Sequence, residues 1–404
     1  MSEAPARDLC TDCGISRTAK PSRCGRACQF IRPDYDGLDK NVHGRRRRDV
    51  GDERFFGVHK RMLRASLNQP IDGAQWTGIA TRLGERLLET GKVDAVLTVR
   101  PHTDDRWRPD PVLVTRAEDM AQCRGMRMGY APLLQLLEPA IAQGHTRLAV
   151  IGIPCQVYAL RALQDEIGLE ELFVIGTPCS DNTTTESFHE FLALLSDRPE
   201  TISYLEFRAD YHVELRFDDG SRRDIPFLAL PISDLPSDFF PLTCRTCVDY
   251  TNTLSDLTVG YMGGTGEQWL VVRNERGEDL VELLGDELKV EVPADSGKRR
   301  GSVTGFLKNT ERAAGGLPLR RMPDWIRPLV SWLMPKIGPK GLEFARARVE
   351  MKAIETILHL RQQKPRRLKS MVPAHVWRLV EPYGLRPSKE ENARRDRCSH
   401  DAQC

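Results

Sequence analysis

The distribution of cysteine constrains this 404-residue chain more than any other feature of its sequence. The first four cysteines fall within nineteen residues in the spacing C-x2-C-x10-C-x3-C, and four more recur as two single residues and one C-x2-C pair. These two quartets are Cys10, Cys13, Cys24 and Cys28, and Cys155, Cys179, Cys244 and Cys247. Because close thiolate pairs in tight turns are typical metal ligands, the pattern predicts two metal or electron-transfer centres.

The surroundings of the cysteines favour thiolates over disulfides. The first residues, MSEAPARDLC, contain no apolar run of the kind that directs export, so an oxidising compartment is not expected. No stretch reaches the roughly 18–20 apolar residues of a membrane span. The nearest, residues 325–337, is interrupted by charged residues and prolines, and we expect it to be buried rather than to lie on a membrane or under a partner.

The net charge of +2 conceals one strongly basic run, Arg45 to Arg48. Such a run forms either a solvated loop or a docking site for an acidic protein or an anionic substrate. Nucleic acid is a poor candidate, because the chain contains no recognisable nucleic-acid module and its overall charge is near zero.

Strand and helix patterns alternate in the first half of the chain. Buried strands are predicted at residues 94–99, 148–153 and 172–175, with helices at 132–142 and 156–166 between them. This alternation predicts an α/β fold with a mixed-sheet core.

The pattern changes after about residue 200. Residues 202–207 and 212–217 read as antiparallel strands, residues 257–262 and 269–273 extend this β-rich region, and residues 341–361 form the clearest helix. We therefore expect a cysteine-rich segment 1–53, an α/β region 54–195, a β-rich region 196–315, a helical extension 316–387 and a disordered tail 388–404.

The spacing of the first quartet fits a four-iron cluster and structural zinc about equally well. The second quartet favours a cluster, because Cys155 and Cys179 each follow a buried strand and a Gly-x-Pro step. If those strands are parallel neighbours, both thiols emerge at one sheet edge, although they could also be ordinary buried cysteines. Cys123 has no clear role, and Cys398 and Cys404 lie in a charged tail that makes them poor ligands.

No G-x-G-x-x-G motif follows a strand, so an ordinary dinucleotide site is not predicted. The glycine-containing stretch GAQWTG at residues 73–78 precedes a predicted helix, whose amides and Thr77 could face a phosphate. Arg124, Gly125, Arg127 and Gly129 form a second flexible, cationic stretch. Gly260, Gly263 and Gly264 would allow close approach to a ligand, but glycines in loops are more often turn residues.

Several of these segments carry a family resemblance. GIPCQVYALRAL, VIGTPCSDNTTTE, PLTCRTCVDYTN and FLKNTERAAGGLPLRRMP resemble the beta-subunit family of coenzyme F420 hydrogenases and dehydrogenases. More narrowly, they are similar to its photosynthetic branch of ferredoxin-dependent reductases of chlorophyll precursors and derivatives. The resemblance runs from about residue 9 to residue 386.

The resemblance implies one FAD and two [4Fe–4S] clusters, one held by each cysteine quartet. It implies flavin contacts near Thr77, Gly78, Arg127, Gly129, Asn182 and Thr183. It also implies reduced ferredoxin as the electron donor and divinyl chlorophyllide or protochlorophyllide a as the substrate, whose 8-vinyl group becomes ethyl. A cytoplasmic protein peripheral to photosynthetic membranes is expected, and a homo-oligomer is compatible with the sequence.

The alternatives are reduction of 7-hydroxymethyl chlorophyll a and a non-catalytic protein that holds zinc or only relays electrons. Only nine residues precede Cys10, which leads us to expect a bacterial protein and so favours the divinyl substrate. Candidates for the proton donor are Asp181, Asp210 and His212. Asp181 could equally cap a helix, and His212 could be an ordinary strand histidine.

Overall fold

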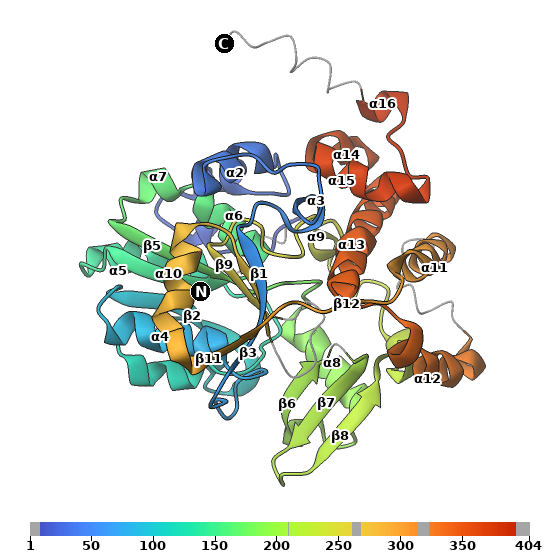
Figure 1. The fold of residues 1–404 in the computed structure, drawn as a ribbon, viewed down its shortest axis with the longest axis horizontal. Helices are drawn as coiled ribbons and strands as arrows, with labels where there is room; N and C mark the ends of the chain where they lie inside the picture. Colours follow the sequence, from blue (N-terminus) through green and yellow to red (C-terminus); the bar gives the residue numbers. More distant parts are fainter. Residues whose placement is uncertain (1–8, 209, 261–267, 314–322, 393–404) are drawn as a thin grey trace.

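The computed structural model describes residues 9–208, 210–260, 268–313 and 323–392 (Figure 1). Its centre is an eight-stranded sheet in the order β11-β1-β10-β9-β5-β4-β2-β3. The strands are β1 Arg61–Leu67, β2 Ala95–His102, β3 Asp105–Val114, β4 Arg147–Gly152, β5 Glu171–Gly176, β9 Leu257–Gly260, β10 Gln268–Val272 and β11 Leu288–Glu291. Strands β2, β4, β5 and β9 run parallel, and antiparallel strands flank them on both sides. The predicted α/β class with a mixed sheet is confirmed.

Helices cover both faces of this sheet, because its central strands alternate apolar side chains between two cores. Val96 of β2 packs with α4 (Ile79–Glu89) and α10 (Glu275–Leu284), whereas Ala95 and Leu97 pack on the opposite face with α5 (Leu137–Ala142) and α6 (Pro154–Arg161). Burial of each large apolar side chain stabilises such a core by roughly 1.5–3 kcal/mol.

The β-rich region is smaller than the sequence suggests. Strands β6 (Ile202–Phe207), β7 (His212–Phe217) and β8 (Arg222–Pro226) form a three-stranded antiparallel sheet that packs against α8 (Thr185–Leu195). Strands β9 and β10, expected to extend this region, instead lie in the central sheet, where β9 pairs with β5. The reason is burial on both faces, since all five residues of β10 are buried.

The C-terminal part is helical, as predicted: α11 (Arg299–Arg312), α12 (Arg327–Ile337), α13 (Leu342–Gln363), α14 (Pro365–Met371) and α15 (Ala374–Val380). Helix α13 packs its apolar side against β10 and α11 and lies beside the central sheet (Figure 1). The expectation that residues 325–337 are buried was wrong, because helix α12 exposes large apolar side chains. Residues Lys389–Asn392, at the start of the tail expected to be disordered, form a short helix tied to Arg361 by an ion pair at 3.0 Å, and residues 393–404 of that tail lie outside the described residues. The segment boundaries remain predictions.

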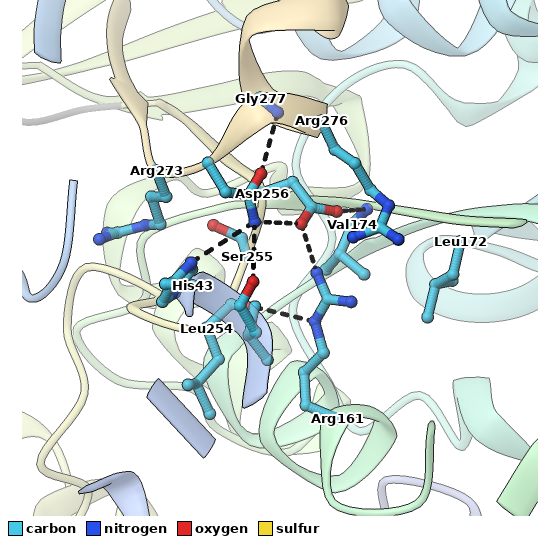
Figure 2. Close-up of polar contacts among 12 residues, drawn as sticks. His43, Arg161, Leu172, Val174, Leu254, Ser255, Asp256, Arg273, Arg276 and Gly277 are labelled. Atoms are coloured by element: carbon cyan, nitrogen blue, oxygen red, sulfur yellow. Dashed lines mark hydrogen bonds and ion pairs between the residues drawn. The ribbon is translucent and has the colours of Figure 1, made fainter. Parts of the chain in front are cut away.

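A buried polar network fixes the loop of residues 249–256, which closely follows Cys247 (Figure 2). The Asp256 carboxylate pairs with the Arg161 guanidinium at 2.7 Å and accepts hydrogen bonds from the Val174 amide and the Asn274 side chain, each at 2.7 Å. His43, from α2 (Tyr35–His43), contacts the Thr253 carbonyl at 2.9 Å. The cysteine-rich segment is therefore joined to the loop that follows the second C-x2-C pair.

Candidate functional site

The first cysteine quartet gathers in the coil and short helix that precede α2. Cys10 and Cys13 lie in coil, whereas Cys24 is the first residue of α1 (Cys24–Ala27) and Cys28 follows its last. Burial raises the pKa of the Cys13 thiol to about 12, and the Cys24, Cys28 and Cys10 sulfurs raise it further, against a backbone hydrogen bond from Ile15. The three other sulfurs of the quartet therefore lie near enough to Cys13 to influence its ionisation.

The second quartet lines one pocket. Strands β4 and β5 pair in parallel with Gly152 opposite Gly176, so Cys155 and Cys179 emerge at the same sheet edge, as expected. Cys244 and Cys247 come from α9 (Leu242–Arg245) and the turn that follows it. All four cysteines line this pocket, together with Thr11, Phe30, Tyr130, Gln156 and Asp181.

The thiols of this pocket strongly resist ionisation. Burial raises the pKa of Cys155 and of Cys179 well above its ordinary value, and the neighbouring cysteines add to both shifts. Burial also raises the pKa of Cys244 to about 12 and that of Cys247 to about 11, although Lys352 opposes both rises. Free thiolates would be costly here, because burial removes them from bulk water.

This donor set fits an inorganic centre. Four thiols that line one pocket, and whose ionisation burial disfavours, suit a cationic metal core that would stabilise their thiolates, and nearby N–H groups donate to cysteine sulfur. The Gln29 side chain donates to the Cys247 sulfur at 3.7 Å, and the Asp12 amide donates to the Cys10 sulfur at 3.4 Å. Among the residues that the structure describes, no three or more His, Cys, Asp or Glu side chains form a group that could hold a single metal ion.

The two quartets are neighbours. The Cys13 sulfur is close enough to raise the pKa of Cys155, and the Thr11 side chain hydrogen-bonds to Cys155. Tyr130 lies between the groups: burial first, then Cys244, Cys155 and Cys10, raise the pKa of its phenol. One chain segment, residues 10–13, therefore belongs to the first quartet and also lines the pocket of the second.

Among the proton-donor candidates, only Asp181 lines the cysteine pocket. Its carboxylate accepts from Lys352 Nζ at 2.6 Å, and Lys352 also pairs with Glu355 at 2.9 Å. Burial raises the pKa of Asp181 to about 6, although Lys352 acts against the rise. Asp181 is not the helix cap that its sequence context allowed, because Thr184 caps α8 by accepting from the Ser187 amide.

Asp210 and His212 lie elsewhere, at the start of β7 in the small sheet. Asp210 forms an ion pair with Arg208 and accepts from the His212 amide at 3.2 Å. Burial, the largest single influence, raises the pKa of the Asp210 carboxyl, but the hydrogen bond and charge of Arg208 together with the contacts from His212 outweigh it and lower this pKa. Neither residue lines the cysteine pocket, so the geometry favours Asp181 among the three.

The two loops predicted to contact flavin lie side by side. Arg124 Nη1 donates to the Asp72 carbonyl at 3.3 Å, and a methyl group on Gly125 would lie 3.4 Å from the Gly73 carbonyl. Within the described part of the chain, three buried polar atoms around these loops have no hydrogen-bond partner: Nε of Arg124, Nε of Arg127 and Oε1 of Glu206. The two orphaned guanidinium donors fit a polar or anionic ligand, such as the phosphates of FAD, whereas Glu206 Oε1 is an acceptor and would suit a hydrogen-bond donor.

Other residues predicted to contact flavin make contacts that stabilise the fold. The Thr77 hydroxyl accepts from the Leu67 amide at 3.0 Å, and Gly78 has φ 90° where it precedes α4, so a side chain there would be strained and would meet Ile71. Gly129 and Asn182 form a reciprocal pair: the Gly129 amide donates to the Asn182 side chain, whose Nδ2 donates back at 2.8 Å.

Thr183, also predicted to contact flavin, is fully buried, and its hydroxyl donates to the Phe239 carbonyl at 2.5 Å. Asn182 is the one member of this group that also lines the cysteine pocket. The loop of Gly129 is thereby joined to the edge of that pocket.

Of the remaining residues singled out from the sequence, some make structural contacts and others lie outside the described part of the chain. Arg47 of the basic run is buried and pairs with Asp39 at 2.6 Å, and Arg45 and Arg48 both pair with Glu53, so the run is not a free cationic patch. Cys123 lies in the core beneath α4, apart from both quartets. Gly263, Gly264, Cys398 and Cys404 lie outside the described residues.

Sequence reasoning missed two pocket residues and one residue beside the pocket. Thr11 and Tyr130 line the pocket, and Lys352 reaches Asp181 from α13. Lys352 and Glu355 are three residues apart on a helix, a spacing that usually indicates a solvent-exposed pair. Nothing in the sequence distinguishes this lysine from an exposed one, although its side chain is only 5% exposed.

Comparison with known proteins defines the family. Residues 62–138 match the family model for the N-terminal part of the coenzyme F420 hydrogenase/dehydrogenase beta subunit, and residues 145–296 match the model for the C-terminal part of the same protein. The chain belongs to this family, a class of iron–sulfur flavoprotein oxidoreductases.

Two relatives extend the similarity over nearly the whole chain. An uncharacterized protein of Nostoc sp. (strain PCC 7120) is 36% identical over 95% of this chain and 96% of its own length. The chloroplastic 7-hydroxymethyl chlorophyll a reductase of Oryza sativa is 37% identical over 94% of this chain and 83% of its own. A chain of the F420-reducing [NiFe] hydrogenase complex of Methanosarcina barkeri shares the fold, with a TM-score of 0.52 and 21% identity over 59% of this chain and 84% of that one.

Proposed function

We propose that this protein is a ferredoxin-dependent reductase of a substituent on a chlorophyll-type tetrapyrrole. The first candidate reaction converts the 8-vinyl group of divinyl chlorophyllide or protochlorophyllide a to ethyl. The observation that carries the proposal is the adjacency of the two cysteine quartets, linked by Thr11 and Tyr130. Two neighbouring redox centres would allow single electrons to pass in steps through one protein chain.

The residues divide into three groups by what they would hold. Cys10, Cys13, Cys24 and Cys28 would ligate one [4Fe–4S] cluster, and Cys155, Cys179, Cys244 and Cys247 the other. The loops at residues 72–78 and 124–129 would hold FAD, with the unpartnered Nε atoms of Arg124 and Arg127 toward its phosphates. When bound, the clusters supply one-electron transfer and the flavin supplies two-electron chemistry.

A second candidate reaction has its own support, because the relative from Oryza sativa is named for 7-hydroxymethyl chlorophyll a. Both reactions take two electrons, one from each of two reduced ferredoxins, and two protons. In the first, a carbon–carbon double bond becomes single and two C–H bonds form. In the second, a C–O bond breaks, one C–H bond forms and water leaves. The same protein machinery could therefore serve either substituent.

The chain's own contribution to protonation is proposed to come from Asp181. Lys352, which also pairs with Glu355, holds this carboxyl in the buried pocket, where it can carry a proton that bulk water cannot easily exchange. Asp210 and His212 are the alternative proton donors. Because both lie outside the cysteine pocket, their variants serve as comparisons for the Asp181 variant. Substituting each aspartate by asparagine, or His212 by alanine, should slow turnover only for the true donor.

The test is anaerobic purification followed by assay with reduced ferredoxin and each pigment in turn. We expect iron with acid-labile sulfide, bound FAD, and loss of either the divinyl or the 7-hydroxymethyl pigment, with the products separated by chromatography. The pigment that disappears identifies the substrate. A colourless zinc protein, or an iron–sulfur flavoprotein that consumes neither pigment, would refute the proposed reactions.

A further inference from the structure

Helix α12 and the turn before it expose large apolar side chains to solvent. Trp325 is 80% exposed, Leu329 54%, Trp332 60% and Ile337 66%. Five other large apolar residues are exposed elsewhere in the described chain, but they are scattered. Isolated exposed apolar residues are ordinary, whereas four within thirteen residues mark an interaction surface.

Helix α12 buries only part of its apolar surface, since Val330, Leu333 and Met334 are half-buried while its tryptophan and other large apolar side chains are exposed. A surface helix buries its apolar face and exposes its polar one. Here Ser331 is 8% exposed and the Arg327 side chain 11%, while the tryptophans face outward. The helix packs against residues Phe227–Ala229 and lies at the edge of the molecule, beyond the small sheet (Figure 1). The contacts of α12 with the rest of the protein therefore keep its exposed apolar side chains in solvent.

The charges around this face are basic. Helix α12 contains Arg327 and Lys336 and no acidic residue, and the exposed Lys340 follows it. The nearest acid in sequence, Asp324, pairs with Arg327 at 3.2 Å. Lys336 Nζ lies 3.3 Å from the centre of the Trp332 ring, a pairing of tryptophan with an exposed cation that suits the boundary between lipid and water.

We propose that α12 attaches this protein to the surface of an anionic lipid bilayer, with Trp325, Leu329 and Trp332 among the acyl chains and Lys336 at the headgroups. The helix lies on the surface and does not span the bilayer, because its eleven residues reach about 16 Å against a hydrocarbon thickness of about 30 Å. Among the described residues, no helix is long and apolar enough to cross a membrane.

A second copy of the chain fits this face less well. The two tryptophans together expose roughly 300 Å² of ring surface, given ~150–250 Å² per aromatic side chain. A stable dimer buries about 800 Å² on each partner. The face is therefore of the size that a membrane anchor uses, and the uncompensated basic charge favours anionic lipid.

The test is co-sedimentation of the anaerobically purified protein with vesicles. Vesicles of equimolar phosphatidylcholine and phosphatidylglycerol should bind the protein, and pure phosphatidylcholine should bind it several-fold more weakly. The W325Q/W332Q variant should lower binding at least about tenfold. The V290S/V292S variant, which removes exposed apolar side chains that belong to β11 and the chain after it, should bind like the parent.

Far-UV circular dichroism confirms that each variant folds. The proposal is overturned if neither vesicle binds the protein, if W325Q/W332Q binds unchanged, or if the native protein is a dimer that this variant dissociates. The assay needs no pigment and no ferredoxin, so its failure is separate from failure of the proposed reaction.

Discussion

Replacing Asp256 by asparagine should destabilise the folded protein by about 3–5 kcal/mol. The Asp256 side chain is fully buried, and that of its partner Arg161 is 1% exposed (Figure 2). Asparagine nearly preserves the volume and still offers one oxygen to the Val174 amide, which donates to the carboxylate at 2.7 Å. The loss is therefore electrostatic: the Arg161 guanidinium stays in the core as a cation without its counterion.

The assay is urea unfolding of the anaerobically purified protein, followed by far-UV circular dichroism. Glu278→Gln is the matched control, because it removes one charge from a 2.6 Å ion pair with Arg61 whose side chains are 27% and 48% exposed. That change should cost less than about 1 kcal/mol. Replacing both partners, as R161M/D256L, should recover part of the loss. If D256N unfolds at the urea concentration of the control, the buried pair does not have the stabilising role assigned to it.

Three further outcomes follow from the site. Cys179→Ser should lower iron per chain to about half, since one of two four-iron groups loses a ligand, whereas Cys123→Ser should leave iron unchanged in the same colorimetric assay. Gly129→Ala should weaken flavin retention on gel filtration, because the added methyl would clash with Thr185 Oγ1 and φ is 148°; retention equal to that of the parent would contradict this. Burial lowers the pKa of His43 to about 3, so stability should fall as pH drops from about 6.5 toward 3, by up to about 1.4 kcal/mol per pH unit, and His43→Gln should remove that slope.

The sequence predicts those features that depend on local pattern. Residues 148–153 and 172–175 were expected as strands and form β4 and β5, and the repeated Gly-x-Pro-Cys step brings Cys155 and Cys179 to one edge because the strands are parallel. The antiparallel pair at 202–207 and 212–217 and the long helix near 341–361 were also correct. In each case the period of the apolar residues carries the information.

The sequence could not predict features that depend on contacts between distant segments. Strand β10 is assigned to the central sheet by its pairing with β1 and β9, and the residues WLVV do not specify a partner. The basic run looked like a free surface, but three of its four arginines form ion pairs with Glu53 or Asp39. Lys352 looked like an ordinary helix-surface residue, but α13 turns it toward Asp181.

Contacts between the cysteine-rich segment and the loop after Cys247 explain how one chain can keep its two cysteine quartets at a fixed separation. Arg47 pairs with Asp39 inside the segment and donates to the Thr253 hydroxyl of the loop at 3.3 Å, and His43 contacts the Thr253 carbonyl. Since these contacts are largely buried, moving the segment would break several polar contacts that strengthen one another in a low-dielectric interior. In the proposed reaction, electron transfer would fall steeply with distance, so this rigidity would favour transfer between the two proposed clusters without any motion of one part of the chain against the other.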